Sequence, residues 1–573
     1  MLQRDPALVL RIRHPVVWAA AAALVLLAVV LVSRETQRRA DARKIGPQLP
    51  IPSAELAGKE LNHRVEALLK SMTLGEKIGQ LVQYTGGVAT GPGTDRQDYG
   101  ALIARGGIGS LFNVVGARET NFWQRIAVEQ SPHHIPLLFG YDVIHGERTI
   151  FPVPLALAAS FDPGMVEGLA RMAAQEACDD GIRWVFSPMV DVARDARWGR
   201  MVEGAGEDPY LGSQMAAAYV RGYQGARLSD PGSVAACVKH FAAYGAPNAG
   251  REYNTVDMSD LTLRQFYLPP YRAAVDAGAA TVMSALNPLN GVPSTANPFL
   301  LTMLLRNQWR FDGFVASDYG AVPELMAHGV AGTPEVAARK ALLAGVDMDM
   351  EGNLYATRLE KEVKAGRLPA AAVDEAARRV LRVKFALGLF EHPYADDAKP
   401  PYAATPEKRE AARKAAEASC VLLKNGGVPA GAPPVLPLAK TLSSIALVGP
   451  LADAAADMLG SWPAAGNPSD AVTLKAALEA RCAASGGKTT LRYAKGTEIR
   501  TASDAGFAEA VAAASQSDVV VVALGESGSE MSGESASVTR LDLPGNQERL
   551  LEAVAATGKP VVLVLFSGRP LAV

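Results

Sequence analysis

Residues 313–320 read Gly313-Phe314-Val315-Ala316-Ser317-Asp318-Tyr319-Gly320, and this stretch decides the fold because it joins an apolar strand to a carboxylate. A buried strand that ends in Asp318 places a charge where a sheet meets solvent, and Gly320 lets the backbone turn away. In barrel and doubly wound α/β folds, this end of the strand carries the chemistry. Asp after a strand also commonly caps the next helix, so the stretch alone leaves catalyst and helix cap as equal alternatives.

Six more apolar segments of similar length alternate with helical stretches along the first two thirds of the chain. Strands that alternate with helices predict a parallel sheet in an α/β fold, and a (β/α)8-type barrel is its most economical closure. A doubly wound open sheet is the alternative. An amphipathic helix over 74–81 precedes the first predicted strand. The predicted strands are 108–112, 136–141, 184–188, 235–238, 281–284, 314–317 and 345–348.

Ionisable residues follow several of these strands. The second strand is followed by Asp142 and His145, the third by Asp191, Arg197 and Arg200, the fourth by Lys239 and His240, and the sixth by Asp318. Groups at the same end of successive parallel strands converge on one mouth of the barrel. Any single one is explained as well by a salt bridge or a cap, but four or more together favour a common site.

A second α/β domain is predicted after the barrel. Residues 392–406 carry four prolines and several charges, as an interdomain linker does. Later strands are expected at 421–424, 445–450, 519–524 and 561–566, with helices at 406–418, 470–480 and 505–514. The predicted domains are therefore a barrel over 55–391, the linker 392–406 and an α/β sandwich over 407–573, which we expect to be incomplete in this chain.

The N-terminus has the features of a membrane anchor. Val16–Val32 is an uncharged run rich in Ala, Val and Leu, at the short limit for a membrane-spanning helix. Basic residues precede it, and no small-x-small cleavage site follows. We predict a cytoplasmic tail over 1–15, a transmembrane signal-anchor over 16–32 and a tether over 33–54, which place the bulk of the protein in the periplasm. A cleaved signal peptide is the alternative, and basic residues beyond the helix favour the opposite orientation.

Length and composition limit the other functional classes. A chain of 573 residues is too long for one hydrophobic core, and its net charge of −2 without a basic stripe argues against a nucleic-acid partner. The four cysteines form no CxxC pair, and no HExxH, P-loop or complete dinucleotide motif occurs, so we expect neither metal nor organic cofactor. Homodimerisation is left open.

A second acidic stretch lies in the second domain. Residues 524–534 read Leu-Gly-Glu-Ser-Gly-Ser-Glu-Met-Ser-Gly-Glu, a loop with Glu526, Glu530 and Glu534 after an apolar strand. Glycine and serine make such a loop mobile enough to reach another domain, although a solvated acidic loop is the simpler interpretation in isolation. Together with Asp318 it supplies two carboxylates, the minimum equipment for cleaving a glycosidic bond.

The segment around Asp318 resembles the nucleophile segment of glycoside hydrolase family 3. Other motifs resemble that family's in the same order, and together they cover nearly everything from about residue 56 to the end. These motifs are 141–146, 197–200 with 207–209, 239–241, 421–425, 532–534 and 568–570. The resemblance, which is strongest to the family's periplasmic bacterial β-glucosidases, implies a barrel followed by an α/β sandwich and commonly a fibronectin-III-like domain.

The resemblance also implies roles for individual residues. Asp318 would be the nucleophile and Glu534 the acid/base, with Glu530 in reserve because the arginine expected four residues after Glu534 stands instead at Arg540. The implied activity is a retaining, exo-acting β-glycosidase that releases terminal non-reducing β-D-glucosyl residues from a carbohydrate substrate. Four residues would hydrogen-bond the sugar hydroxyls: Asp142, Arg200, Lys239 and His240.

Several alternatives stay open. Within the family these are a β-xylosidase and a β-N-acetylglucosaminidase, although the latter's Asp-His pair is not found after Lys239-His240-Phe241. A Schiff-base lyase that uses Lys239 at the end of a barrel strand is a different enzyme class. A membrane-anchored sugar-binding protein without catalysis is the non-enzymatic alternative.

Overall fold

The computed structural model describes residues 56–86, 98–399, 402–426 and 433–573. The predicted membrane segment Val16–Val32, with its tail and tether, lies outside these residues. Within the described ranges, no helix is both long and apolar enough to cross a bilayer.

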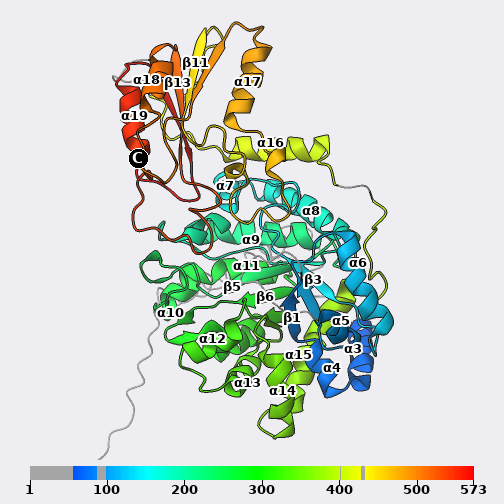
Figure 1. Ribbon diagram of the computed structural model, residues 1–573. Coiled ribbons are helices and arrows are strands. Elements are labelled where there is room, and N and C mark those ends of the chain that lie inside the picture. Colours follow the sequence, from blue (N-terminus) through cyan, green and yellow to red (C-terminus); the bar gives the residue numbers. More distant parts are fainter. Residues whose placement is uncertain (1–55, 87–97, 400–401, 427–432) are drawn as a thin grey trace, which may run out of the picture. The chain divides into compact units, whose positions relative to one another are not determined.

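Eight parallel strands form one sheet in the order β10-β1-β2-β3-β4-β5-β6-β9, which closes nearly completely (Figure 1). The closing contact is a parallel bridge between Ala316 and Met348, next to which the Ser317 amide donates to the Met348 carbonyl over 2.8 Å. The predicted barrel is confirmed, and the open doubly wound sheet is wrong. The strands are β1 (Val82–Thr85), β2 (Ser110–Phe112), β3 (Leu138–Tyr141), β4 (Trp184–Val185), β5 (Ala235–Phe241), β6 (Thr281–Ser284), β9 (Phe314–Ala316) and β10 (Asp349–Met350).

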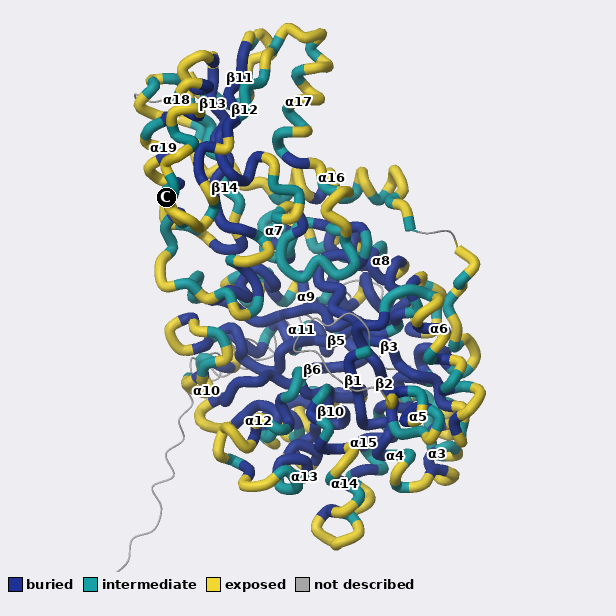
Figure 2. Tube along the Cα trace, viewed as in Figure 1, coloured by how far each residue is buried: buried dark blue, intermediate teal, exposed yellow. Residues whose placement is uncertain are grey.

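Helices surround this sheet and cover its strands, which are buried (Figure 2). Parallel strands covered in this way need apolar residues on both faces, as the run Phe314–Ala316 illustrates. The main barrel helices are α3 (Lys59–Ser71), α4 (Leu74–Gly79), α5 (Tyr99–Ala104), α6 (Ala117–Arg125), α8 (Pro163–Asp179), α9 (Pro209–Gln224), α11 (Pro269–Asp276), α12 (Ala321–Ala327), α13 (Pro334–Ala344), α14 (Leu354–Lys364) and α15 (Ala370–Ala386).

One barrel strand was missed, and three predicted strands differ from the structure by more than two residues. Strand β1 was missed, because it begins three residues after α4 and its apolar run is interrupted by Gln83, whose buried amide bonds Ser110 instead of facing solvent. Strand β5 continues through Lys239 and His240, because its pairing with β6 extends to Phe241. Strand β4 ends at Val185, and the last strand is 349–350 and not 345–348.

The second domain contains a parallel sheet in the order β12-β11-β13-β14. Alternate residues of β13 pack into two cores, Val520 and Val522 on one face and Val519 and Val521 on the other, so helices cover both faces. Its strands are β11 (Ser444–Val448), β12 (Thr490–Ala494), β13 (Val519–Gly525) and β14 (Val561–Phe566), and its helices are α17 (Leu474–Ala484), α18 (Phe507–Ser515) and α19 (Gln547–Ala555). Helix α16 (Pro406–Ser419) precedes this sheet in the chain but packs against the barrel helices α7 (Pro154–Ala159) and α8, and its Ala415 belongs to the barrel core.

The strand predicted at 421–424 is wrong. Val421, Leu422 and Leu423 are exposed, and no strand of the described chain pairs with them. The apolar run met the pattern of a buried strand, but a strand needs a neighbour to satisfy its backbone.

Candidate active site

Asp318 lies just beyond the end of β9, at the mouth of the barrel. Its Oδ1 accepts the Tyr319 amide over 2.7 Å, whereas Oδ2 is buried without a hydrogen-bond partner among the described residues. The side chain does not cap the following helix, because α12 begins after Gly320 with no side-chain cap, so the helix-cap alternative is wrong. Burial raises the pKa of Asp318 to about 7. An oxygen left free at a sheet mouth is available to a ligand.

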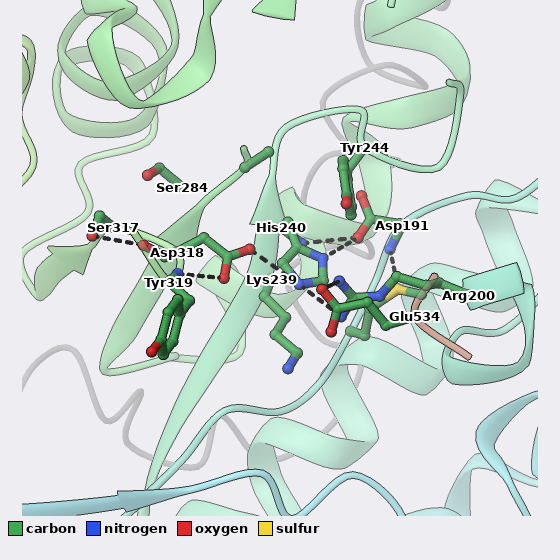
Figure 3. Close-up of polar contacts among 12 residues, drawn as sticks. Asp191, Arg200, Lys239, His240, Tyr244, Ser284, Ser317, Asp318, Tyr319 and Glu534 are labelled. Atoms are coloured by element: carbon green, nitrogen blue, oxygen red, sulfur yellow. Dashed lines mark hydrogen bonds and ion pairs between the residues drawn. The ribbon is translucent and has the colours of Figure 1, made fainter. Parts of the chain in front are cut away.

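His240 stands between Asp318 and the other charged groups (Figure 3). Its Nε2 lies 3.7 Å from Asp318 Oδ2 and 3.1 Å from Arg200 Nη2, and its Nδ1 lies 2.9 Å from Asp191 Oδ2. Because a guanidinium only donates, Nε2 accepts and the ring proton is on Nδ1, directed at Asp191. Burial, together with Arg200 and Lys239, holds the pKa of His240 well below its usual value, so the ring is neutral.

Arg200 is buried in the short helical turn Gly199–Glu203. Its Nε and Nη2 bind the two oxygens of Glu203 over 2.9 and 3.0 Å, a bidentate pair that fixes the guanidinium plane. The remaining nitrogen, Nη1, lies 3.6 Å from Glu534 Oε1. Arg200 therefore joins the barrel to a carboxylate of the second domain.

Lys239 and Asp142 form a buried pair on neighbouring parts of the barrel. Lys239 Nζ donates to Asp142 Oδ1 over 2.8 Å, and the ammonium lies 5.6 Å from the centre of the Trp462 ring. Although burial acts to lower it, Asp142 raises the pKa of Lys239. The lysine is thus charged at neutral pH, which argues against the Schiff-base alternative, since that chemistry needs a free amine.

The three carboxylates of the acidic loop have different surroundings. Glu534 reaches the barrel: its Oε1 accepts the Tyr253 hydroxyl over 2.5 Å. Burial acts to raise the pKa of Glu534, but Arg200 and Tyr253 outweigh it and the net shift is downward. Glu530 is 65% exposed and pairs with Arg500, away from these groups. Glu526 is buried against Arg569.

Two residues of this cluster were not predicted from the sequence: Trp462 of the second domain and Tyr253 of the barrel. Trp462 Nε1 donates to Glu203 over 3.0 Å, beside the Ser461 carbonyl, which accepts from His145 Nε2 over 2.7 Å. Tyr253, which binds Glu534, stands in an irregular segment. Neither residue follows a recognisable strand, so only the type of Trp462, an aromatic among polar and small residues, offered a signal.

Glu252 was also missed. Its Oε1 accepts the Tyr244 hydroxyl over 2.5 Å, and Oε2 is buried without a partner among the described residues. Burial raises the pKa of Glu252 to about 7. Two of the residues noted at strand ends act elsewhere: Arg197 pairs with Asp195 at the surface, and His145 binds two backbone carbonyls.

The assembled cluster suits a polyhydroxylated ligand with a reactive centre. The cluster offers both cationic donors and carboxylate acceptors, and hydroxyl groups can bind both because each one donates and accepts hydrogen bonds. Asp318 offers a free oxygen on one side, and Glu534 comes from the other domain. Their surroundings raise the pKa of Asp318 and lower that of Glu534, so the two carboxyl groups differ in their affinity for a proton.

Comparisons with known proteins agree with this chemistry. The family model "Glycosyl hydrolase family 3 N terminal domain" matches residues 73–383, and "Glycosyl hydrolase family 3 C-terminal domain" matches residues 420–573. A "Periplasmic beta-glucosidase" of Salmonella typhimurium is 44% identical over 534 residues, which are 89% of this chain and 68% of the relative. A "Beta-xylosidase" of Formosa agariphila is 35% identical over 534 residues, 90% of this chain and 68% of the relative.

A solved structure is similar over the same extent. The crystal structure of a beta-glucosidase from Listeria innocua in complex with isofagomine superposes with a TM-score of 0.82 at 41% identity. The match covers 89% of this chain and 70% of that chain.

Proposed function

The chain belongs to glycosyl hydrolase family 3, and on this premise we propose that it is a retaining, exo-acting β-glycosidase that hydrolyses terminal non-reducing β-D-glucosyl residues of β-glucosides and β-gluco-oligosaccharides. One observation carries the proposal: Asp318 Oδ2 is buried, has no hydrogen-bond partner among the described residues and faces the cluster that Glu534 enters from the second domain. The names of the 44% and 41% identical relatives support glucose as the sugar.

The proposed reaction is a double displacement. Asp318 Oδ2 attacks the anomeric carbon while protonated Glu534 gives its proton to the departing glycosidic oxygen, which leaves as an alcohol. The bond between Asp318 and the sugar is then broken by water, whose proton passes to Glu534. Both residues return to their starting states, and the configuration at the anomeric carbon is retained.

The other barrel residues bind the sugar in this proposal. Asp142, Arg200, Lys239 and His240 hydrogen-bond its hydroxyls, the cations as donors and Asp142 as an acceptor. Asp191 Oδ2 accepts a hydrogen bond from His240 Nδ1–H and so keeps His240 Nε2 directed at the cluster, a role like that of other carboxylates behind an imidazole.

A panel of p-nitrophenyl glycosides tests the proposal. We expect the β-D-glucoside to be the best substrate and the first product to be β-glucose, detected by NMR before mutarotation. Asp318→Asn should lose at least ~10⁴-fold in kcat, because a covalent intermediate no longer forms. An α-configured first product, or full activity in Asp318→Asn, would overturn the mechanism.

The same panel separates a second candidate function. A relative named beta-xylosidase is 35% identical over nearly the same length, so a β-xylosidase is the alternative that a specific observation favours. A larger kcat/KM on the β-D-xyloside than on the β-D-glucoside would decide for it. Hydrolysis of neither sugar would favour the sugar-binding alternative.

We also propose the domain limits and the address stated from the sequence. The barrel occupies 55–391, the linker 392–406 and the sandwich domain 407–573, and residues 16–32 anchor the protein in the inner membrane with its site in the periplasm. The relative named periplasmic supports the compartment. Fractionation of cells that express the full chain tests the anchor: activity should sediment with membranes and be released by detergent but not by osmotic shock.

A further inference from the structure

Arg569 is a buried arginine of the second domain that no catalytic role accounts for. It follows β14 and is 3% exposed. All its side-chain nitrogens donate: Nε to Glu526 Oε2 over 2.9 Å, and Nη2 to the Met531 and Ala536 carbonyls over 2.5 and 2.9 Å. The last two acceptors lie on either side of Glu534. Arg569 therefore fixes both ends of the segment that carries Glu534.

The same guanidinium also binds the barrel. Its Nη1 donates to the carbonyls of Ala196 and Arg197 over 3.0 and 3.1 Å. This barrel segment continues directly into Gly199 and Arg200, the residue that lies against Glu534. One planar group thus binds backbone from both segments that meet at the site.

Direct backbone contacts between the two segments run beside this arginine. The Gly533 amide donates to the Gly199 carbonyl over 2.8 Å, and the Val538 amide donates to the Arg197 carbonyl over 2.9 Å. Residues 526–538 contain no helix or strand of their own. Their position is therefore set by tertiary contacts, among them these two backbone bonds, the five hydrogen bonds of Arg569 and the bond from Tyr253 to Glu534.

We propose that Arg569 is a positioning residue, which holds Glu534 where it can protonate the glycosidic oxygen of a sugar bound at Asp318. The inference rests on the proposed function. Only arginine supplies five donors in one plane, so lysine can keep the charge next to Glu526 but cannot bind four carbonyls on two segments. Arg569 touches neither the substrate nor the reacting atoms, and it acts through Glu534.

The expected loss of kcat/KM depends on the leaving group of the substrate. A p-nitrophenolate leaves with little help, whereas an alcohol must be protonated as it departs, and general acid catalysis is worth about 10²–10⁴-fold. In Arg569→Lys we expect kcat/KM to fall by about 10²-fold on methyl β-D-glucoside, and by less than about tenfold on p-nitrophenyl β-D-glucoside. Azide should accelerate turnover of the second substrate, because a misplaced Glu534 no longer activates water.

The experiment compares Arg569→Lys with Arg540→Lys in the full chain. Arg540 belongs to the same part of the domain, is 79% exposed and pairs only with Asp542 among the described residues, so Arg540→Lys should match the parent on both substrates. A selective loss with azide rescue in Arg569→Lys alone supports the inference. An equal loss on both substrates, or no loss, overturns it.

A second variant covers the case in which Arg569→Lys does not fold. Glu526→Gln keeps the arginine but removes the charge that aligns its Nε, and it should show the same selectivity to a smaller extent. Its absence in a folded Glu526→Gln would overturn the inference. Glu534→Ala separates this result from failure of the proposed function: if that variant has no leaving-group dependence either, Glu534 is not the acid and both proposals fall.

Discussion

Asp318 and Glu534 compete for a proton in the free site. Burial raises the pKa of Asp318 to about 7, to which the charge of Glu534 contributes, while Arg200 and Tyr253 lower the pKa of Glu534. Two carboxyl groups that interact strongly titrate in two steps that belong to both groups. The proposed mechanism needs the single proton of the pair on Glu534, although the free site favours it on Asp318, so only the singly protonated pair is reactive.

The basic limb of the pH profile should report the loss of that proton. The pair is deprotonated as the pH rises through about 7, the pKa of Asp318, so kcat/KM on methyl β-D-glucoside should fall above that pH, by about tenfold per unit. In Glu534→Ala the limb should disappear for p-nitrophenyl β-D-glucoside, since only ionised Asp318 is then required. Glu252 titrates in the same range, and Glu252→Gln is the control that should keep the limb. If the basic limb vanished in Glu252→Gln, it would report the titration of Glu252, and its assignment to the pair of Asp318 and Glu534 would be wrong.

Replacing Glu534, the proposed acid/base, should affect formation and hydrolysis of the covalent intermediate differently. Glu534→Ala should lower kcat on methyl β-D-glucoside by about 10²–10⁴-fold, and azide should restore turnover of p-nitrophenyl β-D-glucoside with glucosyl azide as the product. Glu530 is the matched control, because it is exposed and pairs with Arg500. Rescue in Glu530→Ala in place of Glu534→Ala would make Glu530 the acid/base.

Residue types at strand ends were enough to predict much of the barrel half of the cluster. Asp142, Lys239, His240 and Asp318 follow or end apolar strands, and the structure brings all four together with Arg200. Tyr253 and Trp462 could not be found in this way. They lie in irregular segments, where no periodicity indicates which way a side chain points.

Strand β5 shows what an element adds to its sequence. In a regular strand, consecutive side chains point to opposite faces, so Lys239 and His240 should not both reach the mouth. The pairing of β5 with β6 shifts register between Val238 and Phe241, and such an irregularity redirects side chains. Nothing in the residue types predicts this shift. The sequence therefore indicated the strand but placed its end three residues early.

Helix α15 carries one buried lysine at the end of the barrel where the strands begin. Lys384 Nζ donates to Gln80 Oε1 and to the carbonyls of Gly109 and Pro136, each over 2.7 Å. These acceptors immediately precede β1, β2 and β3. Burial lowers the pKa of Lys384 to about 7.

The stability contributed at Lys384 should depend on pH. In the unfolded chain its pKa is about 10.4, so between about pH 7 and 10 the unfolded state binds the extra proton and stability rises with pH. The free energy of unfolding of the parent relative to Lys384→Met should increase by up to about 1.4 kcal/mol per pH unit in this window, measured by urea unfolding. Lys364→Met, an exposed lysine on α14, should show no such slope. A flat difference for Lys384→Met would contradict the prediction.

The whole site exists only where two domains meet. The barrel supplies Asp318 and the residues proposed to bind the sugar, and the second domain supplies Glu534 and Trp462. Alternating strands and helices predicted both domains from the sequence, since that pattern is local. The contact between them includes backbone of irregular segments and the side chain of Arg569. The motif 568–570 marks this arginine in the sequence, but no pattern of residue types shows which groups it binds.

Gly199 lies at the contact between the two domains, where the backbone of the second domain leaves no space for a side chain. A Cβ there would lie 2.3 Å from the Gly533 carbonyl oxygen and 2.7 Å from the Ala536 carbonyl carbon, so Gly199→Ala must push the two segments apart. Because a displacement of about 1 Å costs about 10²-fold, kcat on methyl β-D-glucoside should fall by that factor. Asp318 should stay reactive and still be labelled by an activated 2-fluoro-glucoside, because its strand is untouched.

Gly168→Ala, in helix α8 with nothing within 4 Å, should leave kcat unchanged. Full activity in Gly199→Ala would mean that Glu534 does not depend on this contact, and loss of labelling as well would mean that the barrel itself was damaged.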